Sequence, residues 1–156
     1  MKIRIGAVLL VALLVAADTP DEAVKKEKEK FKGVWVVQSF EAGGKSLDQL
    51  KGMTYEFDGD KLVLKHPKQK EAVVGSYKLD PTKDPKELDL ITPRADGAKS
   101  TTRSIYILDG DELKICCGAN IVTTDSKGKM TEKTGERPKK MDDKSGGFII
   151  LKREKK

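Results

Sequence analysis

One tryptophan and three tyrosines fall on the same side of short runs in which apolar and polar residues alternate: Trp35, Tyr55, Tyr77 and Tyr106. Alternate side chains of a strand point to one face, so we expect these four rings to face a common interior. Tyrosines combine an apolar wall with a hydroxyl group, which suits a pocket for a small, partly apolar molecule. Simple core filling, with each hydroxyl bonded to backbone, is the other interpretation. The candidate lining of such a pocket is Trp35, Tyr55, Phe57, Tyr77, Tyr106 and Ile115.

Residue patterns typical of catalysis are absent from the sequence. A catalytic triad would have to use His66, the only histidine, which precedes Pro67 at a predicted turn. The chain also lacks a glycine-rich phosphate loop and the nucleophile turn of hydrolases. We therefore expect no catalytic residue and a protein that is not an enzyme.

Acidic residues flank glycines in Asp58-Gly59-Asp60 and Asp109-Gly110-Asp111. A calcium loop needs ligands at fixed offsets that end in a bidentate glutamate. Asp-Gly between alternating apolar runs is instead typical of a hairpin turn. A zinc centre needs about four nitrogen or sulfur ligands, and the chain has one histidine and two cysteines. We expect neither a metal site nor a cofactor.

The two cysteines, Cys116 and Cys117, are adjacent. On a strand one would face inward and the other outward. A disulfide between neighbours departs from the geometry that such bonds prefer. Two unlinked, small apolar residues are the favoured interpretation, and a vicinal disulfide, an intermolecular bond and a metal contact stay open as alternatives.

The segment 18–32 is predicted to be a helical lead-in to the domain. Thr19 and Glu22 have the spacing of a capping box, and Pro20 suits the first helical position. Apolar residues are few in the predicted helix, residues 19–32, and Phe31 is its expected anchor.

From Gly33 onward the apolar period is two, which is typical of strands that are apolar on one face and polar on the other. Tight turns join most of these strands, which indicates an all-β antiparallel meander closed into a barrel or folded as a sandwich. Residues 118–147 are polar and glycine-rich and are predicted to form a long loop or a hairpin. The eight predicted strands are Gly33–Phe40, Met53–Phe57, Lys61–Lys65, Ala72–Leu79, Glu87–Ile91, Arg103–Leu108, Glu112–Cys117 and Phe148–Arg153. Their predicted interior side chains are Trp35, Val37, Tyr55, Phe57, Leu62, Leu64, Val73, Tyr77, Leu79, Leu88, Leu90, Tyr106, Leu108, Leu113, Ile115, Ile149 and Leu151.

Residues 1–17, MKIRIGAVLLVALLVAA, have a basic start, an apolar run and small residues before Asp18. That pattern is typical of a cleaved signal peptide, and the run is short for a membrane span. We therefore expect a periplasmic or extracellular protein with no stable membrane span after cleavage. Removing two of the 31 basic residues and none of the 25 acidic ones lowers the net charge from +6 to +4. The basic residues alternate with acidic ones, so we expect no nucleic-acid partner.

Gly33-Val34-Trp35 resembles the Gly-X-Trp signature of lipocalins, and Arg153 lies at the end of the last predicted strand, as the arginine that accompanies this signature does. The whole chain from about residue 31 to 154 also resembles an uncharacterised lipocalin-like family that is abundant in planctomycete bacteria. The matching stretches include Tyr55-Glu-Phe-Asp-Gly-Asp, Gly75-Ser-Tyr-Lys-Leu-Asp-Pro and Ile105-Tyr-Ile-Leu-Asp-Gly-Asp-Glu-Leu-Lys-Ile-Cys.

The resemblance implies a single eight-stranded antiparallel lipocalin-like β-barrel over residues 33–154. It also implies a barrel floor made by Gly33, Trp35 and Arg153, with the guanidinium on the indole ring. It assigns no activity. Our expectation is an exported, non-catalytic protein that binds a small, partly apolar ligand in the barrel. The alternative is an envelope or extracellular protein-interaction module with a solid core, which uses the loop 118–147; its protein partner is unknown.

Overall fold

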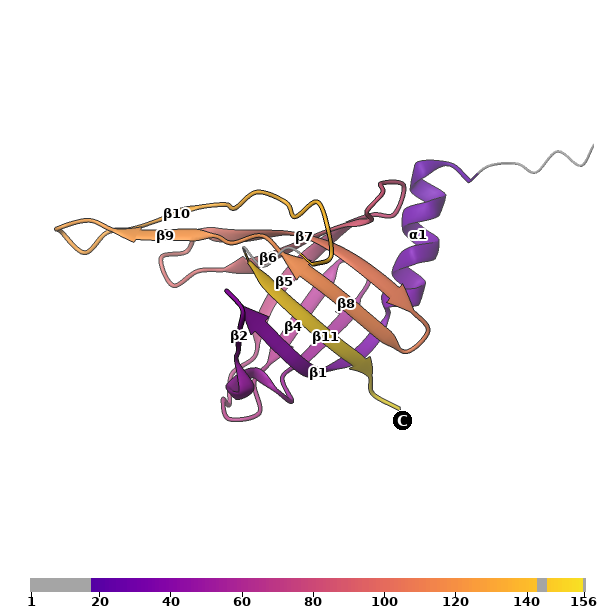
Figure 1. The fold of residues 1–156 in the computed structure, drawn as a ribbon, viewed down its shortest axis with the longest axis horizontal. Helices are drawn as coiled ribbons and strands as arrows, with labels where there is room; N and C mark the ends of the chain where they lie inside the picture. Colours follow the sequence, from indigo (N-terminus) through magenta and orange to yellow (C-terminus); the bar gives the residue numbers. More distant parts are fainter. Residues whose placement is uncertain (1–17, 143–145, 156) are drawn as a thin grey trace, which may run out of the picture.

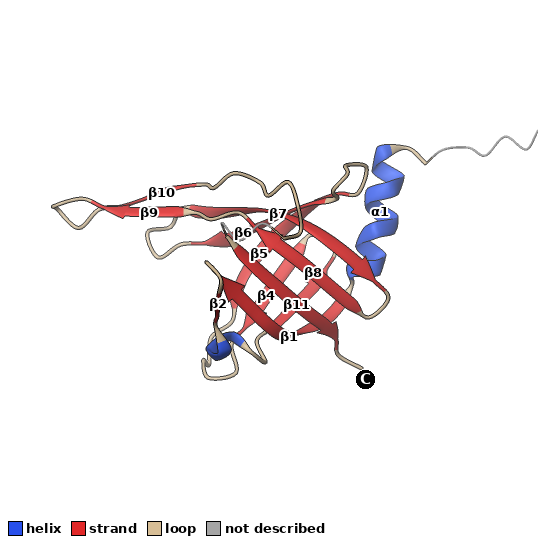
Figure 2. Ribbon diagram, viewed as in Figure 1, coloured by secondary structure: helices blue, strands red, loops and turns tan. Residues whose placement is uncertain are grey.

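A computed structural model describes residues 18–142 and 146–155 of the chain. The predicted signal peptide, residues 1–17, lies outside the described residues. Figures 1 and 2 show the N-terminal helix beside a curved sheet, and a hairpin that extends away from that sheet. The elements in chain order are α1 (Pro20–Phe31), β1 (Gly33–Ala42), β2 (Lys45–Ser46), the 3-10 turn η1 (Asp48–Leu50), β3 (Thr54–Asp58), β4 (Lys61–Lys65), β5 (Val73–Asp80), β6 (Glu87–Pro93), β7 (Lys99–Asp109), β8 (Glu112–Cys117), β9 (Ile121–Thr124), β10 (Met130–Lys133) and β11 (Gly147–Arg153).

Eight strands close into an antiparallel barrel. The order is β11-β8-β7-β6-β5-β4-β3-β1, and β1 pairs with β11 to close the ring. Every pairing is antiparallel, and each strand lies beside its neighbours along the chain except where β2 and the β9–β10 hairpin are inserted. Closure leaves no long unpaired edge in the barrel. The prediction of an all-β, eight-stranded antiparallel barrel with a short N-terminal helix is confirmed.

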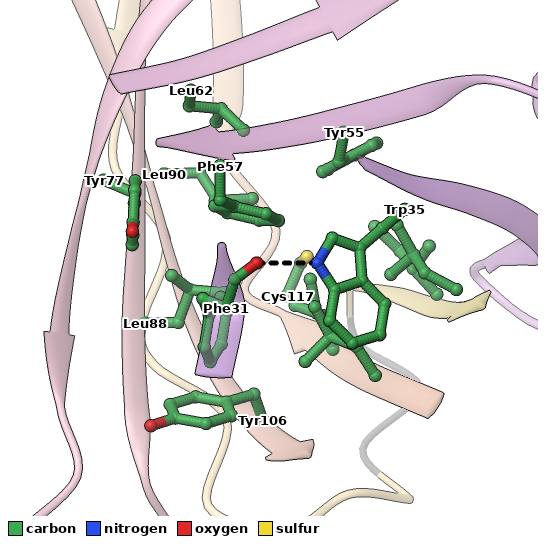
Figure 3. Close-up of a cluster of buried hydrophobic side chains, with 14 of the residues drawn as sticks. Phe31, Trp35, Tyr55, Phe57, Leu62, Tyr77, Leu88, Leu90, Tyr106 and Cys117 are labelled. Atoms are coloured by element: carbon green, nitrogen blue, oxygen red, sulfur yellow. Dashed lines mark hydrogen bonds between the residues drawn. The ribbon is translucent and has the colours of Figure 1, made fainter. Parts of the chain in front are cut away.

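Helix α1 closes one end of the barrel through its last residue. The capping box predicted at Thr19 is present, with Glu22 bonded back to the Thr19 backbone. Phe31 is completely buried and contacts the rings of Phe57, Tyr77 and Tyr106 at centroid distances of 5.2, 6.1 and 5.0 Å. Its backbone oxygen accepts a hydrogen bond from the Trp35 indole at 2.8 Å (Figure 3). We call this the closed end.

The turns at the closed end have the chemistry that the sequence predicts. Gly59 and Gly110 adopt φ of 58° and 56°, which glycine accepts without the steric cost that a Cβ adds. The flanking aspartates are used as partners for nearby basic residues, because Asp58 pairs with Lys32 and Asp60 with Lys28. The Asp58-Gly59-Asp60 turn therefore also attaches α1 to the barrel.

A β-bulge in β1 reverses the alternation that the sequence predicts for this strand. Val37 pairs with Leu151, whereas Phe40 pairs with Ile149, so three residue steps on β1 match two on β11. One extra residue, at Gln38, shifts all later residues to the other face. As a result Phe40, which was not among the predicted interior residues, packs against the core.

The structure buries most of the predicted interior set, and three further residues depart from the predicted alternation. Val73 was predicted to face the interior and is 39% exposed, because it lies at the start of β5, beyond the closed part of the barrel. Ile105 and Cys116, which alternation places on the outer face, are 1% and 0% exposed. The chain after β10 crosses this face: Arg137 binds the Ser104 backbone oxygen at 2.6 Å, and Pro138 is buried.

Strands β6 and β7 are longer than predicted, and the segment 118–147 contains the β9–β10 hairpin. The polar residues 99–102 carry no apolar alternation, yet they pair with residues 90–93 of β6 and lengthen this ribbon beyond the barrel. In Figure 1 the β9–β10 hairpin extends in the same direction as the ribbon, on the left, and α1 stands on the right. Within residues 18–142 and 146–155, no helix has the length and apolar character needed to cross a bilayer.

Candidate functional site

A pocket of about 420 Å³ opens at the end of the barrel opposite to α1. Seven of the eight barrel strands contribute to it, which places the pocket inside the barrel mouth. Its volume is within the range of small-ligand sites, and its walls are mainly apolar, as such sites usually are. The lining residues are Phe40, Ala42, Gly43, Tyr55, Leu64, Leu90, Thr92, Thr102, Cys117, Gly118, Ala119, Gly146, Gly147 and Ile149.

Tyr55 supplies the most distinctive polar group of the pocket. The residue is 5% exposed, and its hydroxyl has no hydrogen-bond partner among residues 18–142 and 146–155. Burial raises the pKa of Tyr55 well above its ordinary value, so the phenol keeps its proton at neutral pH. The protonated hydroxyl can therefore donate a hydrogen bond to a ligand oxygen in the pocket.

The other polar groups of the pocket are small and neutral. Thr92 and Thr102 contribute hydroxyl-bearing side chains from β6 and β7. Cys117 is 7% exposed, and burial raises the pKa of its thiol to about 11, although Ser104 bonds to the sulfur. The thiol is therefore protonated at neutral pH and is a poor nucleophile, because the thiolate is the reactive form.

Of the six predicted lining residues, the structure places only Tyr55 in the pocket. Trp35, Phe57, Tyr77, Tyr106 and Ile115 are buried deeper, in the core between the pocket and the closed end. Figure 3 shows how closely the aromatic rings of this group pack around Phe31. For these five residues the structure shows core filling, which was the second interpretation of the sequence.

Phe31 explains why the aromatic residues fill the core. The sequence assigns this residue only an anchoring role, but it occupies the centre of the ring cluster. Phe57 and Tyr77 also contact each other at 4.8 Å in a T-shaped pair. These contacts leave the Tyr77 hydroxyl buried without a protein partner, and burial raises its pKa to about 12. The helix has thus taken the volume that a ligand would need at this end.

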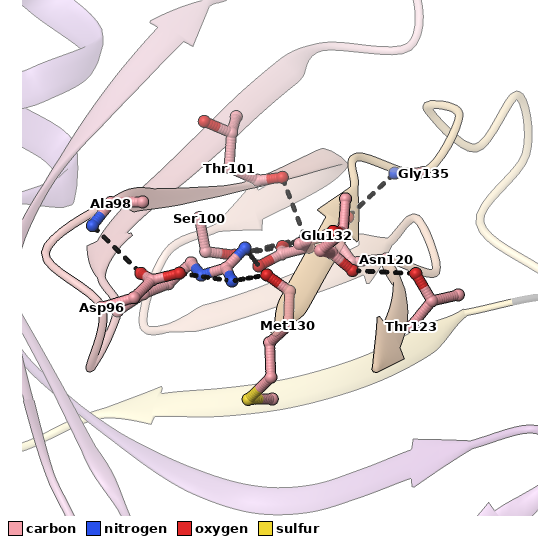
Figure 4. Close-up of polar contacts among 11 residues, drawn as sticks. Asp96, Ala98, Ser100, Thr101, Asn120, Thr123, Met130, Glu132 and Gly135 are labelled. Atoms are coloured by element: carbon pink, nitrogen blue, oxygen red, sulfur yellow. Dashed lines mark hydrogen bonds and ion pairs between the residues drawn. The ribbon is translucent and has the colours of Figure 1, made fainter. Parts of the chain in front are cut away.

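The rim of the pocket is held by a polar network at the base of the β9–β10 hairpin. Glu132 accepts hydrogen bonds from Ser100 at 2.5 Å, from Asn120 at 2.6 Å and from Arg94 at 3.2 Å (Figure 4). Asn120 also donates to the Thr101 backbone oxygen at 3.0 Å. These bonds tie the hairpin to the β6–β7 ribbon and fix the chain immediately before Asn120, which forms part of the pocket wall.

The closed end contains the predicted contact between arginine and tryptophan. The Arg153 guanidinium lies 4.2 Å from the centroid of the Trp35 ring, within cation–π distance. It also donates to the backbone oxygens of Lys30 and Lys32, both at 2.7 Å, and to Asp111 at 3.1 Å. The side chain therefore binds the carbonyl end of α1, where the helix dipole favours a cation.

Gly33 is required at the closed end for two separate reasons. Its φ of 123° is strained for any residue with a Cβ, and a Cβ would lie 3.3 Å from Arg153 Nη1. Gly33, Trp35 and Arg153 thus meet at one end of the barrel, together with the C-terminus of α1. They position the helix and lie away from the pocket.

Glu27 is a buried carboxylate that the sequence analysis did not identify. It is 3% exposed and accepts hydrogen bonds from Lys86 at 2.8 Å, Lys30 at 3.0 Å and the Tyr106 hydroxyl at 3.1 Å. Burial alone would raise the pKa of Glu27, but the bonds from Lys86 and Lys30 outweigh it and lower the pKa. These partners account for its burial and assign it a structural role in attaching α1.

The remaining candidates for chemistry have structural roles. Cys116 and Cys117 do not form a disulfide with each other. His66 lies in a turn, where one ring nitrogen is 2.9 Å from the Gln49 backbone oxygen and the other accepts from the Lys68 backbone amide. In the described part of the chain, no group of three or more histidine, cysteine or acidic side chains is placed to hold a metal ion.

Several pocket residues could not be identified from alternation alone. The β1 bulge hides Phe40, and Gly118 and Ala119 follow the end of an apolar run. Strand order offers one usable signal. If the residues around Trp35 close one end of the barrel, the other end is lined by the interior residues of each strand that lie farthest from the level of Trp35 along the barrel axis. That rule would have selected Leu64, Leu90 and Ile149.

Fold and site together define this protein as an eight-stranded antiparallel β-barrel that a helix closes at one end and that carries a neutral, mainly apolar pocket at the other. No protein-family model matches the chain, and comparisons with curated proteins and with solved structures found no match either.

Proposed function

We propose that this protein is a non-catalytic, lipocalin-like carrier that binds one small, partly apolar molecule in the pocket at the open end of its barrel. The observation that carries this proposal is the position of Tyr55. The side chain is 5% exposed and lines the mainly apolar pocket of about 420 Å³, and its hydroxyl makes no hydrogen bond within residues 18–142 and 146–155. A pocket with apolar walls and a few polar groups that fix orientation is the usual form of a small-molecule site.

Export is part of the same proposal and rests on residues 1–17, whose pattern is that of a signal peptide. A carrier outside the cytoplasm would protect an apolar molecule from water during transfer. Membership in the lipocalin-like family is likewise proposed. The Trp35–Arg153 contact and the eight-stranded closure support it.

A neutral dye tests the binding function directly. N-phenyl-1-naphthylamine becomes fluorescent in apolar surroundings, and we expect saturable binding to the purified protein. Thr102→Trp should weaken binding about ten-fold or more, because the indole ring fills the pocket from β7. Thr131→Trp places the same ring on the exposed strand β10 and should leave binding unchanged.

Circular dichroism and thermal unfolding will show whether Thr102→Trp keeps the fold. If it does not fold, Ala42→Phe at the rim is the second variant, with Ala98→Phe outside the pocket as its control. Absence of saturable dye binding to the unaltered protein, or equal binding by a folded pocket variant and its control, would overturn the proposal.

The second candidate function is protein interaction through the β9–β10 hairpin. The observation in its favour is the exposure of three apolar side chains there: Ile121, Val122 and Met130 are 56%, 52% and 55% exposed. Cross-linking in the native host should then capture a partner that is lost in the triple variant Ile121→Ser, Val122→Ser, Met130→Ser. The control is Ile107→Ser, which alters a 47% exposed residue on the barrel wall.

A further inference from the structure

We infer that the pocket selects ligands without net charge, of the class of medium-chain aliphatic alcohols and similar neutral molecules, over fatty acids and alkylamines of the same length. This inference rests on the proposed binding function and specifies its ligand class. Every described residue that lines the pocket is apolar or neutral and polar. The polar lining groups are Tyr55, Thr92, Thr102 and Cys117, together with backbone.

A charged ligand group would find no counter-ion among the described residues that line this pocket. The described lining contains no lysine, arginine or histidine to pair with a carboxylate, and no aspartate or glutamate to pair with an ammonium group. Burying an ion without a partner costs far more than burying a hydroxyl that is hydrogen-bonded. Arg94, at the base of the hairpin next to the pocket rim, is already engaged with Glu132 and Asp96. The described part of the wall therefore disfavours a charged group that is buried in the pocket.

The polar groups of the pocket can form hydrogen bonds with one uncharged oxygen atom of a ligand. The protonated Tyr55 hydroxyl donates, and the hydroxyls of Thr92 and Thr102 both donate and accept. An alcohol hydroxyl or a carbonyl oxygen beside Tyr55 would accept a hydrogen bond from its hydroxyl, which makes none within residues 18–142 and 146–155. The apolar walls from Phe40, Leu64 and Leu90 would then cover the hydrocarbon part.

The volume of the pocket limits how much of the ligand can be buried. At about 30 Å³ for each water-sized group, a volume of about 420 Å³ accommodates roughly 14 heavy atoms. Decanol, decanoate and decylamine fall within this limit. They share one alkyl chain and differ in the charge of one end.

The experiment measures displacement of N-phenyl-1-naphthylamine by decanol, decanoate and decylamine at pH 7.5. We expect decanol to displace the dye at a concentration at least about ten-fold lower than either charged probe needs. Lowering the pH to 5.5 should improve displacement by decanoate alone, since its neutral fraction rises about 100-fold in this range, above a carboxyl pKa near that of glutamate.

Two variants test how the charge and the hydroxyl groups of the pocket lining determine the ligand preference. Thr92→Lys introduces a cation into the pocket and should reverse the preference, so that decanoate displaces the dye better than decanol does. Tyr55→Phe should weaken displacement by decanol about three- to ten-fold, the cost of one hydrogen bond. The same variant should not lower the thermal unfolding midpoint, because the hydroxyl it removes has no hydrogen-bond partner among the described residues.

The outcomes separate the two proposals. If the dye binds in a Thr102→Trp-sensitive manner but decanoate or decylamine equals decanol at pH 7.5, the inference about charge is wrong and the binding function stands. The same conclusion holds if the dye binds and none of the three probes displaces it. If the dye itself does not bind, the proposed function fails together with the inference.

Discussion

Gly33 and Arg153 show how single residues determine the closed end. A Cβ at position 33 would meet both an unfavourable φ of 123° and the guanidinium 3.3 Å away. Gly33→Ala should therefore lower the free energy of unfolding by about 2–3 kcal/mol in chemical denaturation. Gly43→Ala is the control, because Gly43 also has a positive φ, of 55°, but open space around it. It should cost about 1 kcal/mol, and equal losses at the two positions would contradict the importance of the Arg153 contact.

Arg153 acts through the shape of its guanidinium group as well as its charge. It bonds to three separate oxygens and stacks on Trp35. Arg153→Lys keeps the charge, but a single ammonium group does not reproduce the planar fork. We expect a loss of about 1–3 kcal/mol in the free energy of unfolding. Lys152→Ala, on the exposed side of the same strand, should change it by less than about 0.5 kcal/mol; an unchanged stability for Arg153→Lys would show that charge alone is sufficient.

Helix α1 depends on Glu27 for its attachment, and this attachment is sensitive to pH. Because the pKa of Glu27 is lowered in the folded protein, its contribution to stability is complete above the ordinary value of 4.5 and is lost as pH falls through the lower folded value. Glu27→Gln should therefore be less stable than the unaltered protein at pH 7, by about 1–3 kcal/mol. The difference should shrink as pH falls below about 4.5.

Denaturant unfolding at several pH values measures this difference. Glu29→Gln is the matched control, because Glu29 is an exposed residue of the same helix. Its stability should follow that of the unaltered protein at every pH. A stability difference for Glu27→Gln that does not change between pH 7 and pH 3 would contradict the assigned ionic role.

The β9–β10 hairpin should be held mainly by Glu132. Glu132→Ala removes three hydrogen-bond acceptor contacts, from Ser100, Asn120 and Arg94. We expect faster hydrogen exchange for the amides of residues 121–133 in the variant and unchanged exchange in the barrel strands, because the hairpin pairs only with itself. Glu136→Ala is an exposed control close in sequence. Equal exchange in all three proteins would show that the network does not hold the hairpin.

The architecture of the whole molecule could be predicted because most strands keep a strict alternation and most turns carry glycine at the required position. The helix was also predictable from its capping box. The pocket was not, for three physical reasons. Alternation states which way a side chain faces, but it does not state how far along the barrel axis that side chain lies. The extra residue at Gln38 reverses the alternation of β1. Phe31 enters the barrel from outside the sheet, and no strand pattern records this.

The two ends of the barrel differ in what they contain: side chains fill one end, and the other end holds the pocket. At one end Phe31, Trp35 and Arg153 fill and seal the barrel. At the other end the strands continue past the aromatic core and leave a neutral pocket. Rigidity at the closed end would keep the walls of the open end in place for a ligand.

Amide NMR spectra of the protein titrated with decanol test this division most directly. We predict saturable chemical-shift changes in residues 40–43, 90–92, 117–119 and 146–149, and negligible changes in residues 27–33 and 109–112 at the closed end. A titration without saturable changes would contradict ligand binding by the barrel. Changes centred on residues 121–133 would contradict the position of the site and favour the hairpin as the functional surface.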